Sequence, residues 1–123
     1  DDTYNANPAS LRAALESLDG HPQETWVVLG AFGELGADSL AIHHQMGELI
    51  RDKQITRLFA TGADAAATVS AFGSGGEYFE RQDQLIQALN QALSGQETLL
   101  IKGSRAQKME NVVAALVDNF RAA

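Results

Sequence analysis

Trp26-Val27-Val28-Leu29-Gly30 is an unbroken apolar run that stops at a glycine, and this pattern decides the fold. Strands that helices cover on both faces carry such continuous runs, whereas half-exposed strands alternate apolar and polar residues. Similar runs recur at 57–61 and 98–101, and a weaker one at 77–79. These runs predict the strands of a mostly parallel, buried sheet.

Amphipathic stretches separate these runs. They predict helices near 8–19, 39–53, 64–72, 83–93 and 106–120. Alternating strands and helices predict a three-layer α/β domain, with helices flanking the sheet and right-handed crossovers. The chain opens in a loop motif, as if cut from a larger protein, so a fifth strand is expected before Asp1. No linker or repeat interrupts residues 1–123, which are expected to form a single domain.

The composition narrows the possible functions. With 123 residues and 45% hydrophobic content, the chain suits one ordinary globular domain. Its formal charge of −7 argues against nucleic-acid binding, which needs a basic surface. It has no cysteines, which excludes disulfides and thiolate metal sites. The longest apolar runs are about five residues, against the ~20 that span a bilayer, so membrane insertion and a signal peptide are not expected.

Polar side chains crowd the first eight residues, Asp1-Asp2-Thr3-Tyr4-Asn5-Ala6-Asn7-Pro8. Asn7 is a favourable N-cap, and Pro8 suits the first helical position, where its missing N–H costs nothing. The cluster is therefore expected beside a helix N-terminus, where backbone donors and the helix dipole favour ligand oxygens.

A second polar cluster, Lys102-Gly103-Ser104-Arg105, follows the last predicted strand. Ligands of open α/β sheets bind beyond the carboxyl ends of the strands, so this cluster should share one edge with 1–7, 30–36 and 61–64. A glycine turn, a hydroxyl, a helix N-terminus and a fork-shaped guanidinium suit a carboxylate or phosphate. The alternative is that Ser104 caps the last helix and the cations are simply solvated.

Other motifs point to no complete catalytic centre. The glycine-rich loop 30–36 has neither G-x-G-x-x-G spacing nor a Gly-Lys-Ser/Thr end, so it is interpreted as tight turns that let a helix pack closely. His43 and His44 point about 100° apart on a helix and cannot share one metal ion. They are interpreted as partly buried or surface histidines, and no metal site is predicted.

Four signatures in register resemble the C-terminal domain of the Mur ligase family, in particular of its D-alanyl-D-alanine-adding members. They are the opening Asp1–Pro8, Leu29-Gly30 with Gly33-Glu34-Leu35-Gly36, His43 with Gly47, and Lys102–Arg105 with Met109-Glu110. The resemblance covers about residues 1–118. This chain has Ala31-Phe32 where the family commonly has Asp after the first glycine of Gly-Asp-Met-x-Glu-Leu-Gly. The departure removes a possible hydrogen-bond acceptor.

The resemblance implies a three-domain, cytoplasmic bacterial ligase of peptidoglycan synthesis, with a Rossmann-like C-terminal domain. Such an enzyme phosphorylates UDP-N-acetylmuramoyl-tripeptide with Mg-ATP, and the amine of D-alanyl-D-alanine then attacks the acyl phosphate. The central ATPase domain would hold ATP and magnesium, and the C-terminal domain would close over it. Without the central and N-terminal UDP-binding domains, this chain is expected to be inactive and to bind no cofactor tightly.

Site roles follow from the same resemblance. Asp2 would hold the ATP ribose, with Tyr4, Asn5 and Asn7 along the nucleotide edge. Lys102, Ser104 and Arg105 would face D-alanyl-D-alanine or the reacting phosphate.

Two rival hypotheses remain open at the level of sequence. A receiver-type signalling domain needs an aspartate at the end of its middle strand, where this chain has Thr61-Gly62. A free-standing nucleotide-binding module would need a phosphate loop of its own.

Overall fold

The computed structural model describes residues 7–122, with side chains described for 7–116. Four parallel strands form one sheet in the order β3-β2-β1-β4. The strands are β1 (Thr25–Gly30), β2 (Arg57–Thr61), β3 (Gly76–Phe79) and β4 (Thr98–Lys102). The four strands predicted within the described residues are therefore confirmed, including the weak third one. The strand expected before Asp1 lies outside the described residues.

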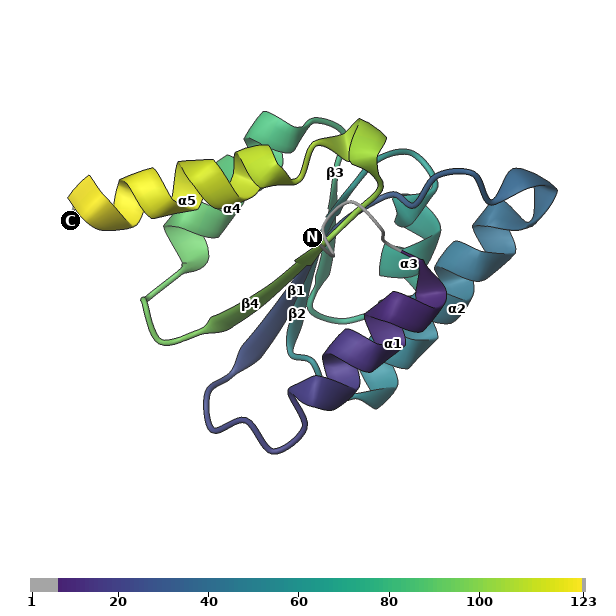
Figure 1. Cartoon of the computed structure of the whole chain (residues 1–123), viewed down its shortest axis with the longest axis horizontal. Coiled ribbons are helices and arrows are strands. Elements are labelled where there is room, and N and C mark those ends of the chain that lie inside the picture. Colours follow the sequence, from purple (N-terminus) through teal and green to yellow (C-terminus); the bar gives the residue numbers. More distant parts are fainter. Residues whose placement is uncertain (1–6, 123) are drawn as a thin grey trace.

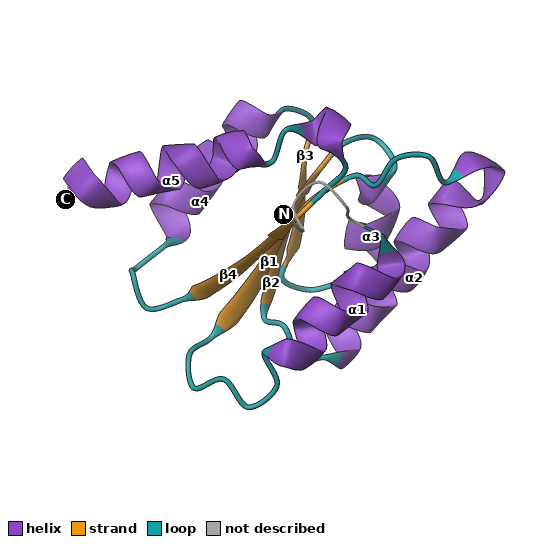
Figure 2. Ribbon diagram, in the orientation of Figure 1, coloured by secondary structure: helices purple, strands orange, loops and turns teal. Residues whose placement is uncertain are grey.

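Helices cover both faces of this sheet and make three layers (Figures 1 and 2). One side carries α1, α2 and α3, and the other carries α4 and α5. The helices are α1 (Pro8–Ser17), α2 (Ser39–Asp52), α3 (Ala65–Phe72), α4 (Gln82–Ala92) and α5 (Glu110–Ala122). The predicted three-layer α/β class is confirmed. No helix within residues 7–122 is long and apolar enough to cross a membrane.

Alternation along β1 divides the core between the two faces, because successive strand side chains point to opposite sides. Val27 and Leu29 pack with Leu11, Met46 and other residues under α1–α3. On the opposite face, Trp26 and Val28 pack with residues of α4 and α5. All the residues of β1 from Trp26 onward are buried, which explains the unbroken apolar run.

A capping box fixes the start of α1. The Oδ1 atom of Asn7 accepts from the Ser10 N–H at 2.9 Å, and the Ser10 hydroxyl oxygen accepts from the Asn7 N–H at 3.0 Å. Pro8 follows at the first helical position. The predicted N-cap is therefore confirmed.

The last helix begins later than its apolar pattern suggests. A short 3₁₀ turn, η2 (Arg105–Gln107), follows β4 instead. Lys108 then adopts a left-handed backbone with φ +51°, which no α-helix accommodates, so α5 begins only at Glu110. The predicted start at residue 106 is wrong for this reason.

Gly47 lets α2 and α3 pack against each other closely. A Cβ at this position would collide with the carbonyl oxygen of Thr68 and lie 2.8 Å from the Ala71 Cβ. The side chain of Thr68 is fully buried there, and its hydroxyl donates to the His43 carbonyl oxygen at 2.8 Å. The two helices therefore meet through backbone contacts.

Candidate functional site

Lys102, Ser104 and Arg105 come together at the carboxyl end of β4. Lys102 closes the strand, pairs with Leu29 of β1 and is only 3% exposed. Leu100, two residues earlier, packs against the core under α1–α3, so Lys102 points to that same face. Ser104 is half-buried and Arg105 is exposed. Exposure therefore increases along the three predicted residues, from the buried Lys102 through Ser104 to the exposed Arg105.

Asn7 lies at the same edge of the sheet. Figure 1 shows α1 running opposite to the strands, so its N-terminus lies beside their carboxyl ends. The Oδ1 atom of Asn7 already accepts one hydrogen bond in the helix cap, from the Ser10 N–H. The other predicted nucleotide contacts, Asp2, Tyr4 and Asn5, lie outside the described residues.

Hydrogen bonds join the loops after β1, β2 and β4. The Ala31 N–H donates to the Thr61 carbonyl oxygen at 2.9 Å, and the Ser104 N–H donates to the Ala31 carbonyl oxygen at 3.3 Å. Gly103 also lies against Gly30, since a Cβ on Gly103 would be 3.1 Å from the Gly30 Cα. The predicted meeting of these loops at one edge is therefore confirmed.

The expected anion cradle at the start of the last helix is absent from this loop. Ser104 makes no capping hydrogen bond to the short η2 turn, and α5 begins six residues later. The first turn of α5 already contains a carboxylate, Glu110, whose Oε1 atom is buried without a hydrogen-bond partner among the described residues. Any anion near Ser104 would therefore be met by the side chains of Lys102 and Arg105 rather than by a helix terminus.

The side chain of Gln107 covers the carboxyl ends of β1 and β2. A Cβ on Gly30 would lie 2.7 Å from the Gln107 Cβ, and one on Gly62 would lie 3.0 Å from its side-chain amide nitrogen. The amide of Gln82 donates to the Gln107 carbonyl oxygen at 2.8 Å and holds this turn in place. The crevice between these two strand ends is thus filled by the protein itself.

The departure from the family pattern falls within this packed region. Ala31 and Phe32 are buried, with 8% and 4% of their surfaces exposed. The methyl group of Ala31 lies against Gly62, because a Cβ on Gly62 would be 2.6 Å from it. Position 31 therefore belongs to the apolar core under α1–α3 in this chain.

The three histidines have different surroundings. His43 is completely buried, which the sequence interpretation of a partly buried or surface residue missed. His44 is exposed, and its Nδ1 atom lies 3.7 Å from the Oε1 atom of Glu48. In its loop, His21 accepts from the Gln23 N–H at 3.2 Å. Within the described part of the chain, no group of three or more His, Cys, Asp and Glu residues could hold a metal ion.

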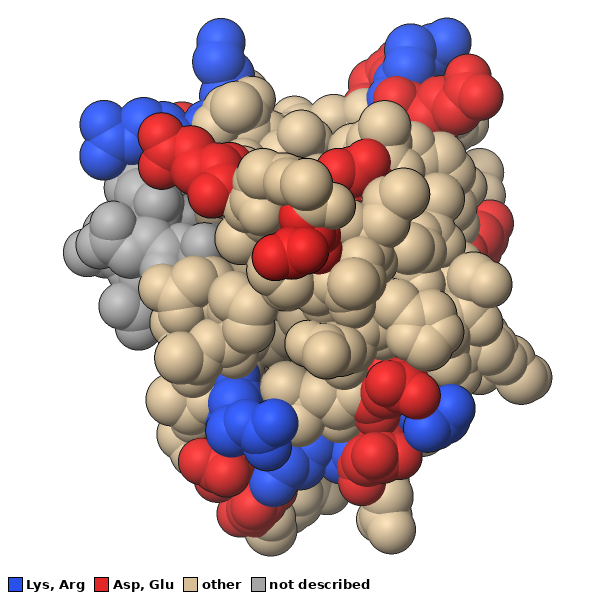
Figure 3. Space-filling view, turned by 90° about the vertical axis from the view of Figure 1, so that its right-hand side faces the viewer, with Lys and Arg blue, Asp and Glu red and all other residues tan. Residues whose placement is uncertain are grey.

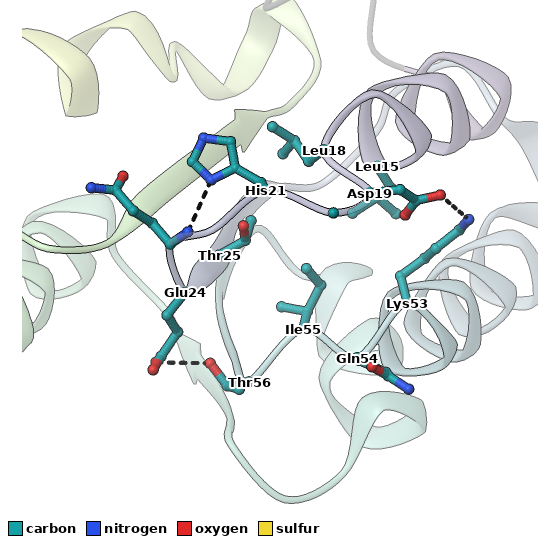
Figure 4. Close-up of a pocket in the computed structure, with 12 residues that line it drawn as sticks. Leu15, Leu18, Asp19, His21, Glu24, Thr25, Lys53, Gln54, Ile55 and Thr56 are labelled. Carbon is teal, nitrogen blue, oxygen red and sulfur yellow. Dashed lines mark hydrogen bonds and ion pairs between the residues drawn. The ribbon is translucent and has the colours of Figure 1, made fainter.

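A hollow of about 260 Å³ lies at the opposite, amino-terminal edge of the sheet (Figure 4). Its lining comes from the end of α1, the loop before β1 and the loop before β2. On its rim, Glu24 accepts from the Trp26 indole at 2.5 Å and the Thr56 hydroxyl at 2.9 Å, and both bonds lower the pKa of Glu24. The sequence patterns did not indicate this hollow, and the described site residues Asn7, Lys102, Ser104 and Arg105 do not line it.

The side of the molecule that carries α2 has mixed charge. In Figure 3, basic and acidic side chains of this side gather toward its upper and lower ends, and the middle is largely uncharged. A shallow hollow of about 150 Å³ lies between α1 and α2, lined by Pro8, Ala9, Arg12, Gln45, Met46 and Leu49. The described residues on this side form no continuous basic surface.

Known proteins resemble this chain over nearly its whole length. Residues 2–105 match the family described as "Mur ligase, glutamate ligase domain". The UDP-N-acetylmuramoyl-tripeptide–D-alanyl-D-alanine ligase of Escherichia coli K12 is 40% identical over 97% of this chain. The match covers 26% of that protein, so the chain spans about a quarter of such a relative.

Solved structures resemble it to the same extent. MurF from Acinetobacter baumannii has a TM-score of 0.82 and 33% identity, over 96% of this chain and 27% of its own. MurF ligase from Thermotoga maritima, solved in complex with ADP, has a TM-score of 0.78 and 25% identity, over 94% of this chain and 26% of its own. These similarities favour neither the receiver nor the free-standing nucleotide-binding hypothesis. The chain belongs to the Mur ligase family, through the part that the family description calls the glutamate ligase domain.

Proposed function

We propose that this chain is the C-terminal domain of an ATP-dependent ligase that joins D-alanyl-D-alanine to UDP-N-acetylmuramoyl-tripeptide in the bacterial cytoplasm. Relatives that carry this name match 95% or more of the chain in Escherichia coli and Bacillus subtilis. The matched part is 26% and 27% of those proteins, so the other domains of the enzyme would supply the remainder. They would include the central domain that binds ATP and magnesium.

The observation that carries the proposal is the buried Lys102 beside the loop of Ser104 and Arg105. Lys102 and Arg105 bring two cationic side chains to the carboxyl edge, where ligands of open α/β sheets bind. Such cations suit an anion that enters with the substrate. The carboxylate of D-alanyl-D-alanine and the acyl phosphate are both anions of this kind.

Each predicted residue has a role that its chemistry allows. Arg105 is exposed and presents a planar fork that binds two oxygens of one carboxylate. The Ser104 hydroxyl would donate to the same group, and Lys102 would stabilise negative charge on the reacting phosphate. Asp2 would accept from the ATP ribose hydroxyls, with Tyr4, Asn5 and Asn7 beside it. Magnesium would be held by the central domain, as the resemblance to the Mur ligases implies.

The test is substitution of Arg105 in the complete enzyme that carries this domain. Arg105→Ala should lower kcat/KM for D-alanyl-D-alanine about 10- to 100-fold, since a charge-assisted hydrogen bond contributes about 1.5–3 kcal/mol. Arg51→Ala is the matched control, because Arg51 is equally a surface arginine but lies in the last turn of α2. Its kinetics should equal those of the wild type. If Arg105→Ala has the same kcat/KM for D-alanyl-D-alanine as the wild type, Arg105 does not bind this substrate.

The nucleotide side is tested separately. Asp2→Ala should raise the apparent KM for ATP and leave the KM for D-alanyl-D-alanine nearly unchanged, because the ribose contact serves only the nucleotide. Residues 1–123 alone should show no ATP-dependent ligation. Turnover by this chain alone would contradict the proposal that the central domain binds ATP and magnesium.

A further inference from the structure

His43 is completely buried, and both of its ring nitrogens make hydrogen bonds. Its Nε2 lies 3.0 Å from the backbone nitrogen of Phe32, and its Nδ1 lies 2.8 Å from the carbonyl oxygen of Ser39. A backbone N–H can only donate and a carbonyl oxygen can only accept. The network therefore assigns a neutral imidazole, with the proton on Nδ1 and the lone pair of Nε2 accepting from Phe32.

The hydrogen bond from Phe32 fixes one particular peptide group. The N–H of Phe32 and the C=O of Ala31 belong to the same planar unit, and in a trans peptide they point in opposite directions. His43 accepts from the N–H end, while the C=O end accepts from the Ser104 N–H at 3.3 Å. A single rigid group thus connects the imidazole to the loop that carries Lys102, Ser104 and Arg105.

The histidine is itself held firmly on two sides. The Thr68 hydroxyl donates to the His43 carbonyl oxygen at 2.8 Å, which fixes this turn of α2 against α3. The Ser39 hydroxyl donates to Asp64 at 2.5 Å, one turn earlier on α2. The rings of Phe32 and His43 meet edge to face, with their centres 6.2 Å apart. The imidazole therefore has little freedom to turn away from Phe32.

Packing alone does not account for a histidine here. Burial of an imidazole costs free energy unless its nitrogens are hydrogen-bonded, and an apolar side chain of similar size would fill the space without that cost. What the histidine adds is an acceptor aimed at one backbone N–H. This acceptor orients the Ala31–Phe32 peptide.

We propose that His43 is a positioning residue for the amino-substrate side of the site, acting through the Ala31–Phe32 peptide on Ser104. This inference rests on the proposed ligase function, because the Lys102–Arg105 loop that His43 would position is the loop to which that function assigns substrate binding. His43 itself touches no substrate. Without its acceptor, the peptide would rotate and the loop would lose the carbonyl oxygen that holds it.

The kinetic test compares three variants of the complete enzyme. His43→Leu removes the acceptor and should lower kcat/KM for D-alanyl-D-alanine about 10- to 100-fold, the loss that is typical when a group that orients a metal ligand is mutated. The KM for ATP should be nearly unchanged. His43→Gln keeps an oxygen that can accept from Phe32 and should recover most of this loss. Thr68→Val is the matched control: it removes a buried hydrogen bond of the same turn and should lower stability but not this specificity constant.

Three kinetic outcomes would overturn the inference. They are wild-type kinetics for His43→Leu, a loss in Thr68→Val as large as that in His43→Leu, and a folded His43→Gln with no recovery. If His43→Leu does not fold, His43→Phe takes its place in the same comparison, because it also lacks an acceptor for the Phe32 N–H but keeps an aromatic ring at this position.

Nuclear magnetic resonance of the 123-residue chain supplies a readout without catalysis. The ring nitrogen shifts of His43 should report the Nδ1-protonated tautomer, and the Ser104 amide signal should move more in His43→Leu than in His43→Gln or Thr68→Val. The opposite tautomer, or an unmoved Ser104 signal, would overturn the inference even for an active enzyme. Conversely, a wild-type complete enzyme that fails to use D-alanyl-D-alanine would overturn the proposed function and leave this coupling intact.

Discussion

Gly30 and Gly103 lie against each other, and neither has room for a side chain, because Met109 also packs on both. A Cβ on Gly103 would lie 3.1 Å from the Gly30 Cα and 2.6 Å from the Met109 Cγ. Gly30 ends β1 and Gly103 directly follows the neighbouring strand β4, at the edge that carries the candidate site. Their contact sets the path of the Lys102–Arg105 loop.

Gly103→Ala should therefore destabilise the domain by about 1–3 kcal/mol, the usual cost of an added methyl group in a filled space. Urea unfolding of the 123-residue chain measures this change. Gly33→Ala is the matched control from the same edge, since its Cβ would make an ordinary contact at 3.5 Å with Ser104. A loss of stability as large in Gly33→Ala would show that the backbone, and not the contact with Met109, is responsible.

Gly47→Ala tests the close packing of α2 and α3. Alanine is favoured over glycine inside a helix by about 1 kcal/mol, yet its Cβ would collide with the Thr68 carbonyl oxygen. We expect a net destabilisation of about 1–3 kcal/mol in thermal or urea unfolding. The reverse change at an exposed position of the same helix, Ala41→Gly, should cost only about 1 kcal/mol. A stabilised Gly47→Ala would mean that the helices separate without cost.

Gln54→Gly should stabilise the domain. Gln54 follows the end of α2 with a left-handed backbone at φ +62°, where glycine avoids a strain of about 1 kcal/mol. The gain expected in unfolding free energy is about 0.5–1 kcal/mol. Gln45→Gly makes the same chemical change at an exposed position inside α2 and should instead destabilise by about 1 kcal/mol. Loss of stability in both variants would exclude strain at Gln54.

Glu24 should make stability depend on pH. Its hydrogen bonds to the Trp26 indole and the Thr56 hydroxyl lower its pKa from the ordinary value of 4.5. A carboxyl group whose pKa is lower in the folded state stabilises that state above pH 4.5, and this contribution is lost as the pH falls through the folded value. Glu24→Gln should thus be less stable than the wild type near pH 7, with a difference that shrinks in acid.

Unfolding curves of both proteins between about pH 3 and pH 7 measure this difference. Thr56→Val leaves the Trp26 bond intact and should lose less of the pH dependence than Glu24→Gln does. A difference between wild type and Glu24→Gln that is constant over this range would contradict the assignment.

The sheet was predictable because a strand that is buried on both faces consists of consecutive apolar residues. All residues of β1 after Thr25 are buried, so the run from Trp26 to Leu29 contains no polar residue. The same reasoning located the carboxyl edge, because parallel strands end on one side. The Mur ligase resemblance then named the family correctly.

Local backbone geometry was less predictable. Nothing in the residue type of Lys108 indicates φ +51°, yet this one residue moves the start of α5 from 106 to 110. The role of His43 was also hidden, because its partners at Phe32 and Ser39 are backbone groups whose identity leaves no pattern in the sequence. Tertiary hydrogen bonds to the main chain become visible only once the fold is known.

Gln107 has a consequence for the energetics of ligand binding. Its side chain lies over Gly30 and Gly62, where a ligand entering between β1 and β2 would first have to displace it. A ligand stabilises a folded protein by an amount that increases with its affinity for the folded form, and the need to displace the Gln107 side chain lowers that affinity. In the folded domain, the side chain of Gln107 already occupies the space between the ends of β1 and β2. A ligand directed at this space should therefore leave the melting temperature of the domain nearly unchanged.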